Sequence, residues 1–402
     1  MQSLTSEEEM YKLCSETEDV TKINIEKKPD SEYVHNSRGQ KLHVHSYWPE
    51  EENLIAIVIS LHGMGCHSNR PMQRYMAESF NKSGLGYICL DFHGHGYSDG
   101  LRGLVDSPEY LLDDVMSLLN ALYNDSPSFS STDYRLNRRL VSAPFFLMGH
   151  SMGGSTAISL GHMLSDRELV ADPPLGVRQP ISKIFRGCLL LCPAIDIKMP
   201  SIYIVTVLDY LVVPLFPNCS VPEMLVSRKS SQNLIWSNKM FQDYVSRDGY
   251  PGNPKGLSYG DPVRFQTAST LVKLAARLKS LLSEIRFPFI VFHDPLEQIV
   301  LVHGSERLIK DSLTLPGRKS IVMVEGGLHD LLSNNFTSIT EKSIEWIMSE
   351  MKMGHHDLRM GSDAIKESKR PIERDYASYF LFFCSLSVVL VVLRSRITDI
   401  LY

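Results

Sequence analysis

The sequence lacks the excess of positive charge that is typical of nucleic-acid-binding proteins and the paired cysteines that are typical of disulfide-rich or zinc-binding proteins. Its 402 residues carry 41 Lys and Arg against 46 Asp and Glu, a formal net charge of −5. Proteins that bind nucleic acid attract its phosphate backbone with an excess of positive charge, so no nucleic-acid partner is expected. Seven cysteines are scattered along the chain without a Cys-x-x-Cys pair. This favours reduced thiols over a disulfide framework or a zinc site.

The N-terminal segment also lacks the basic and apolar regions of a secretory signal. It reads MQSLTSEEEMYKLCSETEDV, and residues 1–32 are rich in Glu, Ser, Thr and Lys without apolar periodicity. We therefore expect a flexible leader over 1–32 and synthesis in the cytosol. The rest of the chain is expected to fold, because 43% of all residues are hydrophobic and 22% are charged, which is ordinary for a globular protein.

From residue 41 onward, short apolar runs alternate with longer amphipathic stretches. The spacing predicts buried strands over 54–61, 87–92, 145–149, 188–192, 287–293 and 320–325. It predicts helices over 70–83, 107–123, 151–164, 266–285 and 338–352. This repetition indicates an α/β fold over 33–353, with a mostly parallel sheet flanked by helices and a site beyond the carboxyl ends of the strands.

Residues 198–262 interrupt this alternation. The stretch begins with an apolar, proline-punctuated run and closes with the turn-rich YPGNPKGLSYGDP. It is interpreted as an inserted lid. Two further polar stretches, 124–139 and 165–183, are interpreted as long surface loops.

The C-terminal part contains a charged linker and an apolar segment. Residues 354–376 are the linker, and the seventeen uncharged residues 377–393 follow it. A helix that spans a bilayer needs about 20 apolar residues, so the length is marginal, although the segment has no polar face. We expect a C-terminal membrane anchor with the catalytic domain facing the cytosol, at the endoplasmic reticulum or another endomembrane. The alternative is an apolar helix docked on the core of a cytoplasmic protein.

The motif Gly-His-Ser-Met-Gly at 149–153 is the strongest chemical signal in the sequence. It follows an apolar strand and precedes a helical stretch, which is the setting of a nucleophile elbow. The tight turn exposes the serine hydroxyl at a helix N-terminus. Ser151 is therefore predicted to be a catalytic nucleophile.

A serine nucleophile needs a histidine base that is oriented by a carboxylate. On this fold the chain order is serine, acid, histidine, and His329 follows the last predicted strand within GGLHD. Asp294 and Glu297 both follow the preceding strand. We favour Glu297 as the acid, because Asp294 is adjacent to a proline and is suited to cap the turn. Asp294 stays open as the alternative.

Two backbone N–H groups are needed to stabilise the oxyanion. The residue after the nucleophile, Met152, supplies one, and the glycine-rich loop His62-Gly63-Met64-Gly65 is predicted to supply the other through Met64. His93 and His95 are too few to form a metal site. No cofactor and no metal are expected.

These motifs resemble those of the monoacylglycerol lipase and lysophospholipase group of α/β-hydrolases, also described as serine aminopeptidase-like hydrolases. The blocks LHGMGCHSNR, DFHGHGYSDG, FFLMGHSMGG, YGDP and GGLHDLL occur in order over most of 38–350. The resemblance implies an oxyanion loop at Met64, a structural turn at 93–98, a nucleophile at Ser151 and a lid over an acyl-chain tunnel. Typical members have glycine and aspartate where this chain has Asp294 and Glu297.

The function expected from these motifs is cleavage of lipid carboxylic esters through an acyl-enzyme on Ser151. Monoacylglycerols and lysophospholipids are the expected substrates. A peptidase or acyltransferase reaction on the same fold is an alternative, and so is a catalytically weak binding or scaffold protein. The sequence does not indicate the head group, the acyl-chain length or the oligomeric state.

Overall fold

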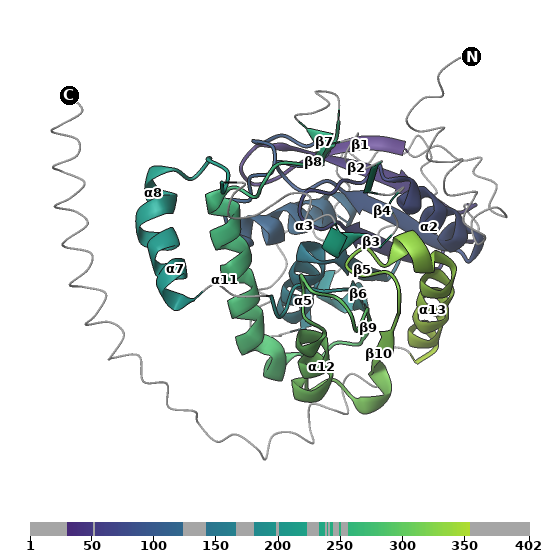
Figure 1. Ribbon diagram of the computed structural model, residues 1–402. Coiled ribbons are helices and arrows are strands. Elements are labelled where there is room, and N and C mark those ends of the chain that lie inside the picture. Colours follow the sequence, from purple (N-terminus) through teal and green to yellow (C-terminus); the bar gives the residue numbers. More distant parts are fainter. Residues whose placement is uncertain are drawn as a thin grey trace, which may run out of the picture. The chain divides into compact units, whose positions relative to one another are not determined.

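The computed structural model describes residues 30–50, 53–123, 142–165, 181–197, 201–222, 233–237, 239, 242–243, 249–250 and 256–353 (Figure 1). The chain divides between Lys352 and Met353 into two units, and the fold described below is that of the first. The predicted linker 354–376 and apolar segment 377–393 lie outside the described residues, as does most of the predicted leader. In the described part of the chain, no helix is both long and apolar enough to cross a membrane.

An eight-stranded sheet forms the centre of the fold, with the order β1-β2-β4-β3-β5-β6-β9-β10. The six strands from β4 to β10 in this order run parallel. They are β3 (Ala56–Leu61), β4 (Leu85–Leu90), β5 (Phe145–His150), β6 (Phe185–Leu191), β9 (Phe289–His293) and β10 (Lys319–Met323). Every residue of β3 and β4 is buried, because helices cover both faces of a parallel sheet. The expected α/β-hydrolase fold is confirmed.

Two antiparallel strands extend one edge of the sheet and were not expected. They are β1 (Asp30–His35) and β2 (Lys41–Tyr47), and β2 pairs with β4. The expectation of a flexible leader up to residue 32 is therefore wrong for its last residues. All six residues of β1 pair with β2, and Val34 is buried in the core.

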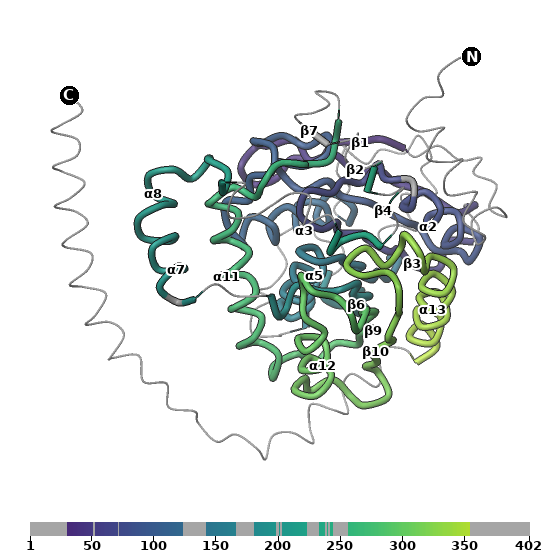
Figure 2. The backbone as a smooth tube through the Cα atoms, viewed as in Figure 1, coloured from purple at the N-terminus to yellow at the C-terminus, as the bar shows by residue number. Residues whose placement is uncertain are grey.

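Helices cover the two faces of the sheet (Figure 2). On one face, α2 (Pro71–Lys82) and α13 (Leu332–Met353) share an apolar cluster with the sheet. On the other face, a larger cluster joins α3 (Pro108–Tyr123), α5 (Met152–Ser165), α6 (Ile181–Ile184), α11 (Phe265–Leu281) and α12 (Val302–Asp311). Two 3₁₀ turns, η4 (Leu282–Glu284) and η5 (Pro316–Arg318), precede β9 and β10. The sequence did not predict α12.

The described part of the predicted insert 198–262 includes a helical run near its start and two short strands near its end. The run consists of α7 (Ile202–Val207), the π-helical turn η3 (Leu208–Val212) and α8 (Val213–Leu215). The strands are β7 (Gly249–Tyr250) and β8 (Ser258–Tyr259). The run is fixed to α11 through Asp209, which accepts a hydrogen bond from Ser269 Oγ at 2.5 Å and lies 3.4 Å from Lys273 Nζ. That the insert acts as a lid stays a prediction.

Candidate active site

Ser151 occupies a sharp turn between β5 and α5. Its φ of +54° lies in the left-handed region, where a residue with a side chain is strained unless its surroundings hold it. Its N–H donates to Leu191 O at 3.0 Å, and its carbonyl accepts from Ala194 N–H at 3.1 Å. The neighbouring β6 and the loop after it therefore hold the turn in place.

The glycines of the motif are required by close backbone contacts. A Cβ on Gly149 would lie 2.3 Å from Gly153 O, and a Cβ on Gly153 would lie 2.1 Å from Leu61 O. Neither distance is possible between non-bonded atoms. Helix α5 can thus start directly behind Ser151 and pack against the end of β3.

His329 and Glu297 form a buried pair at the carboxyl ends of the strands. Glu297 Oε2 lies 2.7 Å from His329 Nδ1, and only 5% of Glu297 is exposed. Its other oxygen accepts from the backbone N–H groups of Ile299 and Val300 at 2.6 and 3.2 Å. Burial alone would raise the pKa of Glu297, but the hydrogen bonds from His329 and these N–H groups hold that pKa below its usual value. An ionised Glu297 keeps a proton on Nδ1 and leaves Nε2 of His329 free to accept one.

Asp294, the alternative acid, has different partners. One carboxylate oxygen accepts from Leu296 N–H and the other accepts from Leu328 N–H, both at 2.8 Å. Leu328 has a φ of +54° and directly precedes His329. Asp294 thus stabilises the strained turn that leads into His329, while Glu297 contacts the imidazole itself.

His150 is a further residue of this site that the sequence did not single out. Its Nε2 lies 2.9 Å from the carbonyl oxygen of His329, and the two rings lie 4.9 Å apart between centroids. Because a carbonyl only accepts, Nε2 carries the proton. Burial lowers the pKa of His150 to about 4, helped by its neighbour His329. The neutral imidazole therefore fixes the backbone of His329, and the only sequence signal for this was its place before Ser151.

The predicted oxyanion loop packs directly against Ser151. A Cβ on Gly63 would lie 3.1 Å from Ser151 Cβ and 3.0 Å from His150 Nδ1. His62 fixes the loop, because its Nδ1 donates to Gly63 O at 2.8 Å and its Nε2 accepts from Phe92 N–H at 3.1 Å. Met64 is half-buried against the core, and Met152 is the first residue of α5. Both are thus near Ser151, and their role as N–H donors stays a prediction.

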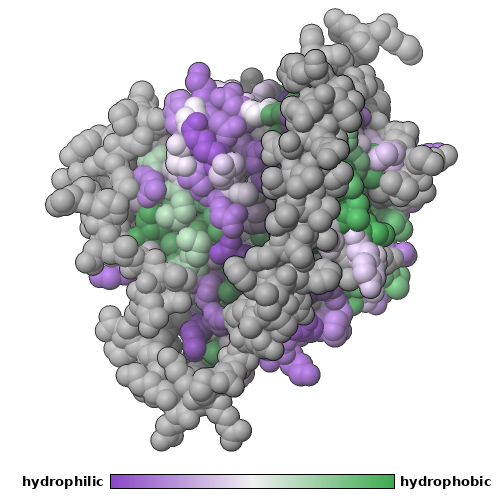
Figure 3. Space-filling view, turned by 90° about the vertical axis from the view of Figure 1, so that its left-hand side faces the viewer, coloured by the Kyte–Doolittle hydropathy of each residue, from purple (hydrophilic) through white to green (hydrophobic). Residues whose placement is uncertain are grey.

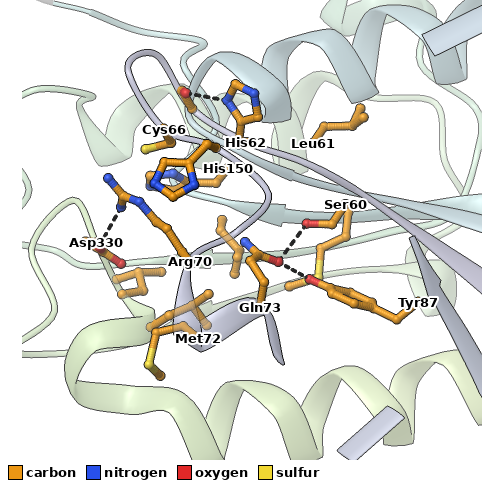
Figure 4. A pocket seen from close by; sticks show the side chains of 16 residues that line it. Ser60, Leu61, His62, Cys66, Arg70, Met72, Gln73, Tyr87, His150 and Asp330 are labelled. Atoms are coloured by element: carbon orange, nitrogen blue, oxygen red, sulfur yellow. Dashed lines mark hydrogen bonds and ion pairs between the residues drawn. The ribbon is translucent and has the colours of Figure 1, made fainter. Parts of the chain in front are cut away.

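A cavity of about 50 Å³ adjoins this site (Figure 4). Its lining includes Gly63, His150 and Asp330, which belong to or adjoin the site, together with Ser60 and Gln73. The side-chain oxygen Oε1 of Gln73 accepts from Ser60 Oγ at 3.2 Å and from the Tyr87 hydroxyl at 2.5 Å. Near the site, an Arg70 guanidinium nitrogen lies 3.6 Å from Asp330 Oδ2. The cavity therefore combines apolar walls with polar groups.

The histidines of the 93–98 turn have structural partners. His93 Nδ1 lies 2.6 Å from an Asp114 oxygen, and His95 Nδ1 donates to His93 O at 3.0 Å.

Within the residues that the structure describes, the one group of side chains close enough to share a metal ion is Cys192, Glu297 and His329. Two of these are already joined by the hydrogen bond described above.

Comparison with known proteins gives consistent matches. Residues 52–335 match the hydrolase family described as "Serine aminopeptidase, S33". The chain is 24% identical to the monoglyceride lipase of Mus musculus over 304 residues, which cover 75% of this chain and 84% of that protein.

Two solved structures show the same fold. A monoacylglycerol lipase of Paleococcus ferrophilus is 20% identical with a TM-score of 0.57, over 77% of this chain and 99% of that one. A soluble variant of the monoglyceride lipase of Saccharomyces cerevisiae is 16% identical with a TM-score of 0.60, over 82% and 98% of the two chains.

Proposed function

The chain belongs to the serine aminopeptidase S33 family of hydrolases, and from this membership and the geometry above we propose that it is a serine hydrolase that cleaves carboxylic esters of lipids. The observation that carries the proposal is the 2.7 Å hydrogen bond between Glu297 and His329 beside the turn that holds Ser151. This bond leaves Nε2 of His329 free to act as a base. Monoacylglycerols and lysophospholipids are the proposed substrates.

The proposed reaction proceeds through an acyl-enzyme. His329 Nε2 takes the proton of Ser151 as Oγ bonds to the ester carbonyl carbon, and Glu297 stabilises the imidazolium that forms. The N–H groups of Met64 and Met152 stabilise the oxyanion. The carbon–oxygen bond of the ester then breaks, and the alcohol leaves with the proton from Nε2. Water, deprotonated by His329, attacks the acyl-enzyme, releases the fatty acid and restores the hydroxyl of Ser151.

The surface of the insert supports a lipid substrate. The run α7–η3–α8 and the residue after it expose large apolar side chains, namely Tyr203, Ile204, Val207, Tyr210, Leu211, Leu215 and Phe216. Tyr203 is 81% exposed. The side of the molecule on which α7 and α8 lie shows hydrophobic surface next to hydrophilic surface (Figure 3). Apolar area removed from water would supply binding energy for a lipid, and we propose that the insert is a lid that takes up the acyl chain.

The cavity beside the site supports a lipid substrate whose leaving alcohol carries further hydroxyl groups. Arg70, Gln73 and Asp330 line it, and polar groups in a largely apolar pocket fix the orientation of a ligand. We therefore propose that the leaving alcohol of the lipid lies on this side of Ser151.

We also propose that residues 377–393 attach the protein to a membrane with the catalytic domain in the cytosol. At 1.5 Å per residue, a helix of this length would reach about 25 Å, which suits a thin bilayer such as that of the endoplasmic reticulum. The support for this is the uncharged composition of the segment.

Release of fatty acid tests the proposed function. The purified chain is incubated with a monoacylglycerol and, separately, with a lysophospholipid, and the fatty acid is quantified by mass spectrometry. We expect release from at least one of them by the native chain and none by Ser151→Ala. Absence of release from both lipids would contradict the proposal, as would equal release by the variant.

A further inference from the structure

A short segment of the insert is hydrogen-bonded to the loop that carries His329. Asp330 N–H donates to Ile235 O at 3.0 Å, and Trp236 Nε1–H donates to Asp330 Oδ2 at 2.7 Å. Ser237 Oγ donates to Gly326 O at 2.7 Å. Residues 235–237 therefore contact the loop on both sides of His329, although Ser237 is 89 residues from Gly326 and Trp236 is 94 residues from Asp330 in the sequence.

Trp236 is the buried centre of this contact. It is only 6% exposed and belongs to the same apolar cluster as Val324, Leu331 and Leu332. A buried indole N–H needs an acceptor, and a carboxylate acceptor gives a stronger bond than a neutral one. Asp330 Oδ2 also lies 3.6 Å from Arg70, whose guanidinium extends between Asp330 and His150 in Figure 4. The position of Asp330 is thus fixed from two sides.

Three successive residues of the loop around His329 are held by side chains from elsewhere, two through their backbone and the third through its side chain. Asp294 accepts from the N–H of Leu328, His150 donates to the carbonyl of His329, and Trp236 donates to the carboxylate of Asp330. A strained residue such as Leu328 keeps its conformation only where its surroundings over-determine it. Each of these three contacts therefore contributes to the placement of the imidazole.

We propose that Trp236 is a positioning residue for His329, acting through Asp330. This inference rests on the proposed function, because it concerns the base of that reaction. The indole N–H holds Asp330, which keeps His329 at the distance from Ser151 that proton transfer requires. Misplacement of a catalytic group by about 1 Å can cost on the order of a hundredfold in rate. The insert would thus contribute to catalysis by orienting the base as well as by binding lipid.

The test compares two Trp→Phe variants in the full chain. Trp236→Phe keeps an aromatic ring in the core and removes the N–H donor. Trp346→Phe on α13 is the control, because Trp346 is partly buried, packs against the same apolar cluster and has its ring centroid 5.6 Å from that of Phe146. With a short, water-soluble ester we expect kcat of Trp236→Phe to fall about tenfold with KM unchanged. We expect both constants to be unchanged in the control.

A double-mutant cycle with Asp330→Ala separates positioning from packing. If Trp236 acts through Asp330, the double variant loses no more kcat than the more damaged single variant, because coupled residues are not additive. Additive losses would overturn the inference. So would a fall in KM and kcat together, or an equal fall of kcat in Trp346→Phe.

Amide hydrogen exchange gives a readout that does not depend on activity. The N–H groups of Leu328 and Asp330 are hydrogen-bonded in the intact loop, and we expect both to exchange at least about tenfold faster in Trp236→Phe than in Trp346→Phe. Equal exchange in the two variants would overturn the inference. If the native chain hydrolyses no ester, the proposed function fails, while the exchange experiment still decides whether Trp236 holds the loop.

Discussion

The carboxylate of Glu297 lies 2.7 Å from Nδ1 of His329, and both side chains are almost excluded from solvent. Three residues earlier, Asp294 is fully buried but contacts the backbone of the loop instead. The two carboxylates are therefore expected to differ in their effect when each is replaced by its amide.

Glu297→Gln should lower kcat by about a thousandfold or more, because the amide neither stabilises the imidazolium nor fixes the tautomer of His329. Asp294→Asn should reduce the free energy of unfolding by about 1–3 kcal/mol through loss of an acceptor for a buried N–H. Its loss of kcat should be smaller than that of Glu297→Gln. Steady-state kinetics and denaturant unfolding of both variants check this, and a greater loss of kcat in Asp294→Asn would assign the acid role to that residue.

Stability should fall as the pH drops from about 6.5 towards 4. Burial lowers the pKa of His62 and His150 to about 4 and that of His95 to about 3, against an ordinary value of 6.5. At these three histidines the unfolded chain therefore binds more protons than the folded chain in this window, and they make the free energy of unfolding rise with pH there. The lowered pKa of Glu297 contributes in the same direction, since its stabilisation is lost as pH falls through its folded pKa.

The measurement is urea unfolding at a series of pH values. His95→Gln is the informative variant, because an amide N–H can replace Nδ1–H as the donor to His93 O without titrating. We expect a shallower dependence of stability on pH below 6.5 in this variant. A native chain that is equally stable at pH 7 and pH 5 would show that these histidines are not held neutral.

Exposed apolar residues of the insert should affect lipid hydrolysis more than hydrolysis of a soluble ester. Ile204→Ser and Val207→Ser should leave the thermal unfolding temperature unchanged, because both side chains are more than half exposed. They should raise KM for a long-chain monoacylglycerol, because less apolar surface is available to the lipid. Assay of both substrates checks this, and an equal effect on an acetyl ester would contradict a role of this surface in lipid binding.

Truncation after Asp375 should release the protein from membranes. The truncated chain keeps Ser151, Glu297 and His329, so we expect hydrolysis of a water-soluble ester to be retained. Fractionation of cells that express either form measures the distribution. A full-length chain that is already soluble without detergent would rule out the membrane anchor, as would a truncated chain that no longer folds.

Local sequence patterns were sufficient for the central part of the fold. The apolar runs predicted six parallel strands, because a strand buried on both faces is apolar along its whole length. β1 and β2 were not predicted, since His43, His45 and other polar residues interrupt any apolar run there. In the folded protein such histidines contact buried side chains. His43 Nδ1, for example, lies 3.0 Å from an oxygen of Asp91. The helix α12 was missed because it has only 10 residues and contains Gly304.

Contacts between residues that are far apart in the sequence were the least predictable part of the site. The motif and its chain order indicated Ser151 and His329, but sequence position alone left two carboxylates open, and only the distances distinguish their contacts. His150 and Trp236 reach the His329 loop from 179 and 94 residues away. No local pattern reports a hydrogen bond across such a separation.

The most direct test of the account is covalent labelling of Ser151. A fluorophosphonate probe reacts with a serine that is activated by a neighbouring base, and the site of attachment is identified by peptide mass spectrometry. We predict that the native chain is labelled on Ser151, that Ser151→Ala is not labelled and that His329→Ala is labelled far more slowly. Labelling that is absent from the folded native chain, or that persists in Ser151→Ala, would contradict the account.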